Sequence, residues 1–530
     1  MMKAKNPKPS PSFFNSNRFY IIAVTILFFL IYLSIYDNKI DLNGDNMGYF
    51  ASAQNLSSGK GFSYAFDANG AKLAEPIGYP LIVAAVMLFT KNFAVISFVN
   101  ALFMLGSVIL LYFICLRLGI PRIIWILTAL FVILNPTIMR YSFIHMSEAS
   151  FIFFSILGIY YYYQIDLDSR LEKQKEFYFM LAACLIGYFI RSGGVVLLLA
   201  LLIALAWNKK FIAAGIAIAF FLLPIMIWNT RAQGENRYVT AVLSVNPYDL
   251  SQGKLTVNTA IDRVKENIDR YTRKEIPYSI FGFLQRINDP TEKKDFYLYV
   301  IGVLVVLISL VGIFFKFTWN DRRLLLFLYL AGTMTMLLCW PTQWYGPRFI
   351  IPILPLIVLF LLKGVYELTH WISAKYALKP IKYFFYSLFL LIPFFIGRSQ
   401  SNPVENKNDL ANARYIAHTR YTPPYQNYFN LGKWAKSNLP ANSIVATRKP
   451  TLFYHTYGGY TMFYPTQVKN YQEFLDGLKS AKATHLVVDE LGYGSSRFLN
   501  PIVEGNPQIF TLLHSIENPS TRLYRINYPQ

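Results

Sequence analysis

The feature that most constrains this chain is a succession of apolar runs that contain almost no charged residues. A membrane-spanning helix needs about 20 such residues. Only 15% of the 530 residues are charged and 54% are hydrophobic, whereas a water-soluble domain carries about 25% charged residues. The sequence therefore predicts an α-helical polytopic membrane protein with about eleven transmembrane helices, at residues 19–36, 94–116, 123–140, 149–163, 178–190, 195–207, 211–228, 296–315, 324–340, 349–362 and 383–396.

The first and the shortest runs need separate interpretation. Run 19–36 is longer than the apolar core of a signal peptide, about 7–15 residues, and no small-residue cleavage site follows it, so we expect a retained anchor. Run 77–89 is preceded by Pro76 and contains Gly78 and Pro80. It is too short to span comfortably, and we interpret it as an interfacial or re-entrant helix.

Charge placement predicts the orientation, because Lys and Arg concentrate in cytoplasmic loops. With the N-terminus in the cytoplasm, every predicted inner loop is basic. Two large loops, 37–92 and 229–295, and the segment after residue 397 then lie outside. A bacterial inner membrane is the expected location, and functional residues are expected on the outer face.

The C-terminal tail differs in pattern from the rest of the chain. Helical patterns at 430–438 and 471–480 alternate with strand patterns at 443–447 and 484–488, which predicts a small α/β soluble domain. We therefore expect a transmembrane domain at 1–398, with the outer loops 37–92 and 229–295, and an extracytoplasmic domain at 399–530. The loop 229–295 has an amphipathic stretch near 261–271, typical of a helix lying on the membrane.

The net charge of +21 is scattered through short loops and is not clustered on one soluble face with interleaved aromatic residues. This placement argues against a nucleic-acid partner. The three cysteines, Cys115, Cys184 and Cys339, lie in or beside apolar segments, so neither a disulfide framework nor a thiolate metal site is indicated.

Ionisable residues in the first outer loop are candidates for chemistry. Asp45 precedes an apolar helical pattern at 49–56, and it is either a helix N-cap or a general base at the membrane surface. Glu75, with Lys72 and Tyr79 nearby, belongs to the loop that leads back to the membrane. A solvated loop glutamate is the alternative interpretation of Glu75.

Further candidates stand at the ends of later apolar runs. His145 and Glu148 lie at the start of run 149–163, where an ionisable group is a functional candidate, although Ser147 and Glu148 could instead cap a helix. Arg191 and Arg348 lie on the outer side, against the inside bias of the other arginines. Guanidinium groups suit phosphate, but snorkelling to headgroups is the alternative. His145 with Glu148 is only a weak metal-ligand pattern.

These segments resemble the GT-C class of polytopic membrane glycosyltransferases. The resemblance rests on the sequences at 45–53, 75–80, 147–148 and 345–355. It is strongest to the dolichyl-phosphate-mannose protein mannosyltransferases and the bacterial lipid A aminoarabinose transferases. The tail at 434–465 is similar in kind to the outer soluble domain of many bacterial relatives. The resemblance implies a GT-C fold with outer-face juxtamembrane helices.

The resemblance also implies roles for the candidates. Asp45 would be the catalytic carboxylate. In the eukaryotic relatives a second acid follows this residue, whereas Asn46 stands here, which puts protein O-mannosylation in doubt. The other implied residues line the acceptor cavity (Glu75, Tyr79, His145, Glu148 and Tyr345) or bind the donor phosphate (Arg191, Arg348 and Lys72).

The function implied is inverting transfer of a sugar from a polyprenyl-phosphate donor to a hydroxyl of a glycan, lipid or protein acceptor, outside the membrane. No cofactor is expected to be required, because arginines can stabilise the leaving phosphate and the outer loops contain no Asp-x-Asp pair; a divalent metal is possible but not indicated. Two other classes remain open, a lipid-linked glycan flippase or transporter and an O-antigen-type polymerase or ligase that uses the basic segment 231–286.

Overall fold

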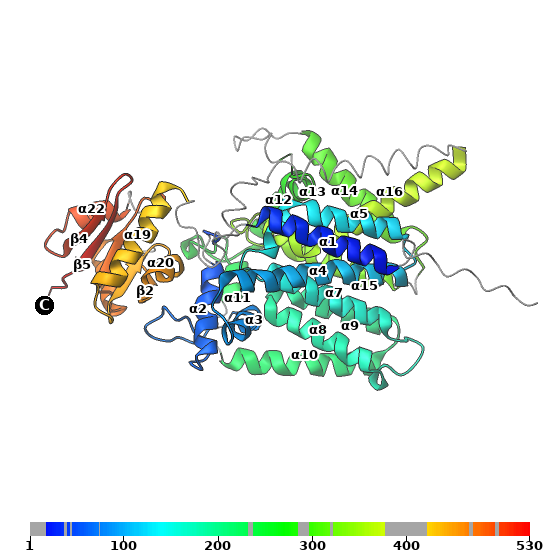
Figure 1. Cartoon of the computed structure of the whole chain (residues 1–530), viewed down its shortest axis with the longest axis horizontal. Helices are drawn as coiled ribbons and strands as arrows, with labels where there is room; N and C mark the ends of the chain where they lie inside the picture. Colours follow the sequence, from blue (N-terminus) through cyan, green and yellow to red (C-terminus); the bar gives the residue numbers. More distant parts are fainter. Residues whose placement is uncertain are drawn as a thin grey trace, which may run out of the picture.

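The molecule is a helical membrane part joined to a small soluble domain. The computed structural model describes residues 17–36, 40–42, 45–73, 75–231, 237–282, 284, 296–318, 322–376, 421–465, 470–492 and 498–529. In Figure 1 the long helices lie side by side on the right and the soluble domain is at the left. Helices α2 (Asp45–Ser57) and α3 (Gly78–Met87) lie at the end of the membrane part that faces this domain.

The predicted apolar runs form helices wherever the structure describes them. The long helices are α1 (Asn17–Ile35), α4 (Phe93–Arg117), α5 (Arg122–Leu134), α7 (Glu148–Gln164), α8 (Lys175–Ile190), α9 (Val195–Trp207), α10 (Phe211–Arg231), α14 (Phe296–Phe314), α15 (Arg323–Leu338) and α16 (Leu354–Tyr376). Among the described residues, five helices are long and apolar enough to cross a membrane, or six with one bent pair. The predicted run 383–396 lies outside the described residues.

The predicted span 123–140 is not one continuous helix. Helix α5 ends at Leu134, and the short helices α6 (Pro136–Met139) and η2 (Arg140–Ser142) continue at an angle of 64°. Asn135 is fully buried at the break. Its Oδ1 accepts a hydrogen bond from the Ile138 backbone N–H at 3.1 Å, which caps α6 in front of Pro136. Proline cannot continue the hydrogen bonding of the preceding helix, so the Asn-Pro pair ends α5.

Helices α14 and α16 approach each other through glycines. A Cβ atom on Gly364 would lie 2.0 Å from the carbonyl oxygen of Ile308, and one on Gly312 would lie 2.0 Å from that of Phe360. Small residues at such positions allow backbones to touch, which is how membrane helices gain packing energy without a hydrophobic driving force.

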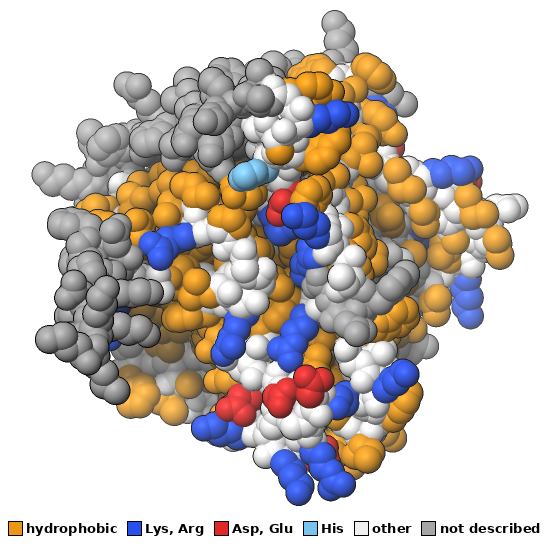
Figure 2. All heavy atoms as spheres, turned by 90° about the vertical axis from the view of Figure 1, so that its right-hand side faces the viewer, with side chains coloured by type: hydrophobic (Ala, Val, Ile, Leu, Met, Phe, Trp, Pro, Cys, Tyr) orange, Lys and Arg blue, Asp and Glu red, His pale blue; other side chains and the backbone are white. Residues whose placement is uncertain are grey.

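The end of the membrane part opposite to the soluble domain is basic. Figure 2 views this end and shows Lys and Arg side chains spread across it. The loops that gather there join α4 to α5, α7 to α8, α9 to α10 and α14 to α15, and they carry Arg117, Arg170, Lys173, Lys209, Lys210 and Lys316.

Short helices cover the end that faces the soluble domain. The run 77–89 forms α3, a helix of 10 residues, which agrees with the expectation that it does not span. The middle segment contains α11 (Arg237–Leu243), the amphipathic α12 (Val257–Arg270), the π-turn η6 (Tyr271–Glu275) and α13 (Ile276–Ile280). Helix α12 is fixed to the end of α15, because the Asn267 side-chain amide donates to the carbonyls of Leu338 (2.9 Å) and Trp340 (2.8 Å).

The soluble domain is an α/β domain built on one five-stranded mixed sheet of order β2-β1-β3-β5-β4. Its strands are β1 (Ile444–Thr447), β2 (Tyr460–Phe463), β3 (His485–Val488), β4 (Phe510–Ile516) and β5 (Thr521–Ile526), and its helices are α19 (Pro423–Asn438), α20 (Pro450–Tyr457), α21 (Tyr471–Ser480) and α22 (Asn500–Glu504). Strand β1 is parallel to β2 and β3, whereas β5 is antiparallel to β3 and β4. The predicted boundary at residue 398 lies outside the described residues.

The soluble domain is docked directly on α2. One apolar cluster contains Met47 and Phe50 of α2 together with Leu452 and Phe453 of α20. The Tyr454 hydroxyl of α20 donates to Oε1 of Gln54 of α2 at 2.7 Å. Helix α2 is therefore held between the membrane helices and the soluble domain.

Candidate functional site

Arg348 joins two carboxylates that are far apart in the sequence. It lies in the short helix η8 (Pro347–Phe349), between α15 and α16. Its Nη1 donates to Asp45 Oδ2 at 2.6 Å and its Nε donates to Glu148 Oε1 at 2.7 Å. Burial disfavours the charge of this guanidinium, but the carboxylates of Glu148 and Asp45 outweigh burial and raise the pKa of Arg348 above its ordinary value. Arg348 therefore stays charged.

Arg191 completes the charged group from the other side. Helix α8 ends at Ile190, and the following Arg191 places Nη1 2.5 Å from Glu148 Oε1 and 3.2 Å from the Ser147 hydroxyl. Two guanidinium groups thus share one carboxylate oxygen. We call Asp45, Glu148, Arg191 and Arg348 the carboxylate–arginine cluster.

The two carboxylates of the cluster differ in exposure. The Glu148 side chain is completely buried, whereas half of the Asp45 side chain is exposed. A carboxylate between two guanidinium groups and away from solvent fixes their positions. The exposed carboxylate of Asp45 is the one that another molecule can reach.

Asp45 and Ser147 have side-chain partners outside their own helices. Asp45 is the first residue of α2, and its carboxylate bonds to Arg348 of a distant segment. Ser147 precedes α7, but its side chain makes no capping hydrogen bond. Ser147 instead receives a hydrogen bond from Arg191.

Two tyrosines lie next to the carboxylate–arginine cluster. The Tyr49 hydroxyl lies 3.5 Å from the Ser147 hydroxyl, and the Tyr49 ring meets the Tyr79 ring edge to face at 5.1 Å. Tyr79 is fully buried, and its hydroxyl accepts a hydrogen bond from Asn100 Nδ2 at 2.9 Å. Tyr79 therefore packs against Tyr49 of α2, and its place in the acceptor cavity, which the resemblance implies, stays a prediction.

The soluble domain adds a lysine that sequence reasoning missed. Lys449 follows β1, and its Nζ donates to the Leu42 carbonyl at 2.6 Å, three residues before Asp45. Burial is the main reason that the pKa of Lys449 is lowered, while the charges of Asp41, Asp489 and Asp45 act in the opposite direction. Lys449 lies in the tail, far along the chain from every motif of the first outer loop, so no local pattern connects it with Asp45.

The remaining candidate residues are not hydrogen-bonded to the cluster in the part of the chain that the structure describes. Glu75 is partly buried in the loop before α3, and its Oε2 has no hydrogen-bond partner among the described residues. Lys72 is exposed, and the structure does not bring it into the cluster. His145 is buried, with Nε2 3.1 Å from the Ser97 hydroxyl and 3.0 Å from the Phe93 carbonyl oxygen.

Tyr345 is on the rim of this region. The residue is 60% exposed, and the guanidinium carbon of Arg270 on α12 lies over its ring, 4.9 Å from the ring centre. Within the described part of the chain, no three His, Cys, Asp or Glu side chains gather in a way that could hold a metal ion. The expectation that the reaction needs no metal stays a prediction.

A family description matches part of the chain. Residues 70–232 match the model of the dolichyl-phosphate-mannose-protein mannosyltransferases. This is less than a third of the 530 residues. It includes Glu148 and Arg191 but neither Asp45 nor Arg348. No curated protein matches the sequence.

Similarity to solved structures extends over the whole chain. Eleven solved chains match. One is the crystal structure of ArnT from Cupriavidus metallidurans bound to undecaprenyl phosphate, with a TM-score of 0.54 and 11% sequence identity over 97% of this chain and 99% of that one. At this identity the likeness is one of fold. The protein therefore has the GT-C fold of membrane glycosyltransferases, and within it residues 70–232 are similar to the dolichyl-phosphate-mannose-protein mannosyltransferases.

Proposed function

We propose that this protein is an inverting glycosyltransferase that moves a sugar from a polyprenyl-phosphate donor to a hydroxyl acceptor at the outer membrane surface. The observation that carries the proposal is the bridge of Arg348 between Asp45 and Glu148. Asp45 begins α2, the helix on which the soluble domain is docked. The match of residues 70–232 to the mannosyltransferases and the undecaprenyl phosphate bound to ArnT support the donor class.

Asp45 is the proposed general base. It is the half-exposed carboxylate of the cluster, so an acceptor hydroxyl can approach it within hydrogen-bond distance. Glu148 is buried between two arginines and is proposed to position them.

Arg191 and Arg348 are the proposed phosphate ligands. Their two positive charges face one buried carboxylate, that of Glu148, so one positive charge remains for an anion once Arg348 releases Asp45. A planar guanidinium matches the oxygens of a phosphate. Binding of the donor phosphate to Arg348 would free the Asp45 carboxylate for the acceptor.

The proposed reaction is a single displacement. The acceptor oxygen forms a bond to the anomeric carbon as the bond from that carbon to the phosphate oxygen breaks. The bonding electron pair stays on the phosphate, which leaves as polyprenyl phosphate next to the arginines. The acceptor proton moves to Asp45. Attack opposite to the leaving group inverts the anomeric configuration.

The charge distribution supports the proposed orientation. The basic end in Figure 2 lies opposite to the cluster, and Lys and Arg prefer the cytoplasmic side. The cluster and the soluble domain are therefore proposed to lie outside the cytoplasm.

The test compares the purified full chain with Asp45→Asn and with a control, Asp262→Asn. Asp262 lies on α12, its side chain is 74% exposed, and its ion pair with Lys265 is long at 3.5 Å. Each protein is incubated with polyprenyl-phosphate-linked sugars and candidate acceptors, and mass spectrometry follows release of polyprenyl phosphate. We expect Asp45→Asn to bind donor but to lose at least about a hundredfold in rate, with Asp262→Asn unchanged.

Two outcomes would contradict parts of this proposal. Equal rates of wild type and Asp45→Asn would exclude Asp45 as the base and make Glu75 the next candidate. Passage of intact donor across a liposome bilayer, without release of polyprenyl phosphate, would favour the flippase.

A further inference from the structure

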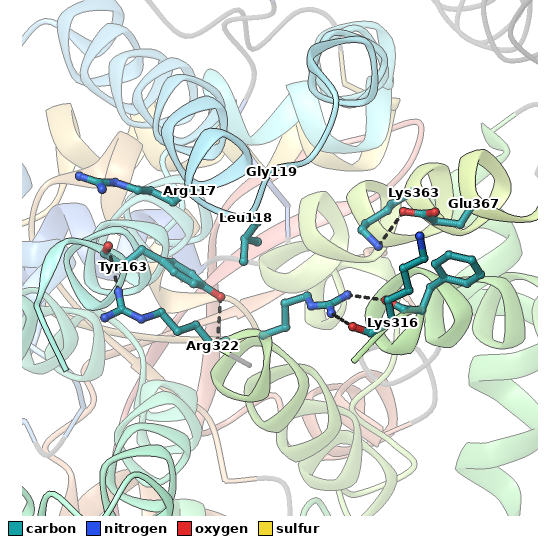
Figure 3. Close-up of a pocket in the computed structure, with 10 residues that line it drawn as sticks. Arg117, Leu118, Gly119, Tyr163, Lys316, Arg322, Lys363 and Glu367 are labelled. Atoms are coloured by element: carbon teal, nitrogen blue, oxygen red, sulfur yellow. Dashed lines mark hydrogen bonds and ion pairs between the residues drawn. The ribbon is translucent and has the colours of Figure 1, made fainter. Parts of the chain in front are cut away.

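Arginine side chains hold helix ends in place at the basic end of the membrane part. Figure 3 shows a polar cavity there, where Arg322 donates a hydrogen bond to the Tyr163 carbonyl near the end of α7 at 3.2 Å. Arg323 donates in the same way to the Phe315 carbonyl, directly after α14, at 3.0 Å. Side chains of α12 make the same kind of bond at the opposite end, to the segment that carries Arg348.

The segment that carries Arg348 connects α15 to α16. Helix α15 ends at Leu338, and the short helix η8 begins at Pro347. Residues 339–346 between them contain no helix or strand. Segments of this kind move more readily than helices, so contacts from other elements decide where the Arg348 guanidinium lies.

Helix α12 holds the first half of this segment. The buried Asn267 side-chain amide donates to the carbonyls of Leu338 and Trp340. One turn further along α12, Arg270 Nη1 donates to the Thr342 carbonyl at 2.5 Å. These carbonyls lie at or after the end of α15, where no helical partner remains for them. The two side chains therefore fix the course of the segment as it leaves the helix.

The second half of the segment is held by Arg270 and Glu275. The Arg270 guanidinium lies over the ring of Tyr345. Glu275, at the end of η6, is 2% exposed and accepts a hydrogen bond from the Gly346 backbone N–H. Gly346 has a φ of 120°, a conformation that residues other than glycine rarely adopt. This hydrogen bond therefore holds an unusual backbone conformation two positions before Arg348.

The α12–α13 segment, residues 257–280, is itself anchored on membrane helices. A Cβ atom on Gly302 of α14 would overlap the carbonyl oxygen of Thr272 in η6, so the two backbones touch. The buried Asn135, at the end of α5, donates through Nδ2 to the Ser279 carbonyl of α13 at 2.8 Å. The α12–α13 segment thus connects two membrane helices to the backbone that precedes Arg348.

We propose that the α12–α13 segment positions Arg348 for the donor phosphate, with Arg270 and Glu275 as positioning residues. This inference rests on the proposed function, in which Arg348 binds that phosphate. Arg270 and Glu275 act through the backbone, because the atoms that they bond belong to the segment before Arg348. Misplacement of a group by about 1 Å can cost about a hundredfold in rate.

The first test compares Arg270→Gln with Arg263→Gln in the full chain. Arg263 also lies on α12 and also donates to backbone carbonyls, but these are the carbonyls of Val242 and Ser244, in a different segment. Arg263 is 5% exposed, whereas the Arg270 side chain is 24% exposed. The control should therefore lower the stability of the protein at least as much as Arg270→Gln.

Hydrogen–deuterium exchange measures how firmly the segment is held, and it does not require activity. We expect the peptide that covers residues 339–350 to exchange at least about tenfold faster in Arg270→Gln than in wild type. In Arg263→Gln it should exchange at the wild-type rate. Equal exchange in the two variants overturns the positioning role of Arg270, whatever the activity of the protein.

Glu275 has a matched pair of variants of its own. Glu275→Gln retains an oxygen that accepts the Gly346 N–H, whereas Glu275→Leu removes it. We expect faster exchange of residues 339–350 only in Glu275→Leu. Faster exchange in both variants, or in neither, overturns the role of this hydrogen bond.

The second test asks whether Arg270 acts through Arg348. Native mass spectrometry measures binding of undecaprenyl phosphate to wild type, Arg270→Gln, Arg348→Lys and the double variant in detergent. We expect Arg270→Gln to weaken binding about tenfold when Arg348 is present and less than about twofold in Arg348→Lys, because coupled residues are not additive. Equal factors in the two backgrounds overturn the inference. A wild type that neither binds this lipid nor releases it from a donor contradicts the proposed function, while the exchange comparison still decides the positioning role.

Discussion

Two carboxylates share Arg348, and their surroundings give them different expected responses to substitution. Glu148 is fully buried and accepts hydrogen bonds from two arginines, whereas Asp45 is half exposed and accepts one. A buried charged hydrogen bond contributes more to stability than an exposed ion pair, which contributes about 0–1 kcal/mol. Loss of Glu148 should therefore affect folding, and loss of Asp45 should affect the reaction.

Glu148→Gln keeps the shape of the side chain and removes its charge. The change leaves Arg191 and Arg348 without their shared carboxylate, and we expect the free energy of unfolding to fall by about 2–3 kcal/mol. Thermal unfolding in detergent measures the shift, with Asp45→Asn as the matched comparison. A Glu148→Gln protein that is as stable as Asp45→Asn would contradict the structural role of Glu148.

The members of the cluster could be predicted from the sequence, but their pairing could not. Asp45, Glu148, Arg191 and Arg348 stand out because ionisable residues at the ends of apolar runs are unusual. Arg348 is 303 residues from Asp45 and 200 from Glu148, and only the folded helix bundle determines that one guanidinium reaches both. The difference in side-chain exposure between Asp45 and Glu148 likewise depends on the folded helix bundle.

At the scale of elements, the contact of α14 with α16 leads to a prediction. A Cβ atom on Gly364 would lie 2.0 Å from the Ile308 carbonyl oxygen, so Gly364→Ala must separate the helices. Overpacking of this kind costs about 1–3 kcal/mol, and we expect a lower thermal midpoint in detergent.

Gly215 provides the control for this substitution. It lies in α10, and a Cβ atom there would meet nothing within 4 Å. Gly215→Ala should be neutral or slightly stabilising, because Ala favours helix by about 1 kcal/mol over Gly. Equal midpoints for the two variants would show that the α14–α16 contact can relax without cost.

Elements were predictable where local pattern determines them. Apolar runs became helices, and the strands at 443–447 and 484–488 were found within one residue of β1 and β3. The break at Asn135 was not predicted within run 123–140, because the run has no charged residue before Arg140, and Asn135 and Pro136 were the local signals. Strands β2, β4 and β5 were not predicted. Most residues of β4 are exposed or half-buried, so it lacks the continuous apolar run that marked β3.

At the scale of the whole molecule, the two ends of the membrane part carry different groups of charged residues. The basic loops lie at one end, and the carboxylate–arginine cluster and the soluble domain lie at the other. The alternation of basic loops along the sequence predicted this separation. The docking of the soluble domain on α2 could not be predicted, because it depends on the shapes of two surfaces that are more than 350 residues apart in the chain.

This docking gives Lys449 a role that can be tested. Its ammonium group bonds to the Leu42 carbonyl and interacts electrostatically with Asp45, so it holds the segment that leads into the proposed base. Lys449→Met keeps most of the apolar stem and removes the bond. We expect the rate of polyprenyl phosphate release to fall by about tenfold to a hundredfold, because small displacements of a catalytic group are costly. The fold should be retained, since the apolar contacts of Leu452 and Phe453 remain.

The matched control is Lys433→Met, on the exposed surface of α19 in the same domain. Both variants lose one positive charge, so a general effect of charge on the soluble domain would lower both rates equally. A specific effect of Lys449 would lower only the rate of Lys449→Met. It would persist at high salt, because a buried contact is screened much less than an exposed one. If Lys449→Met and Lys433→Met release polyprenyl phosphate at the wild-type rate, the soluble domain does not position Asp45, and the geometry of the cluster depends on the membrane helices alone.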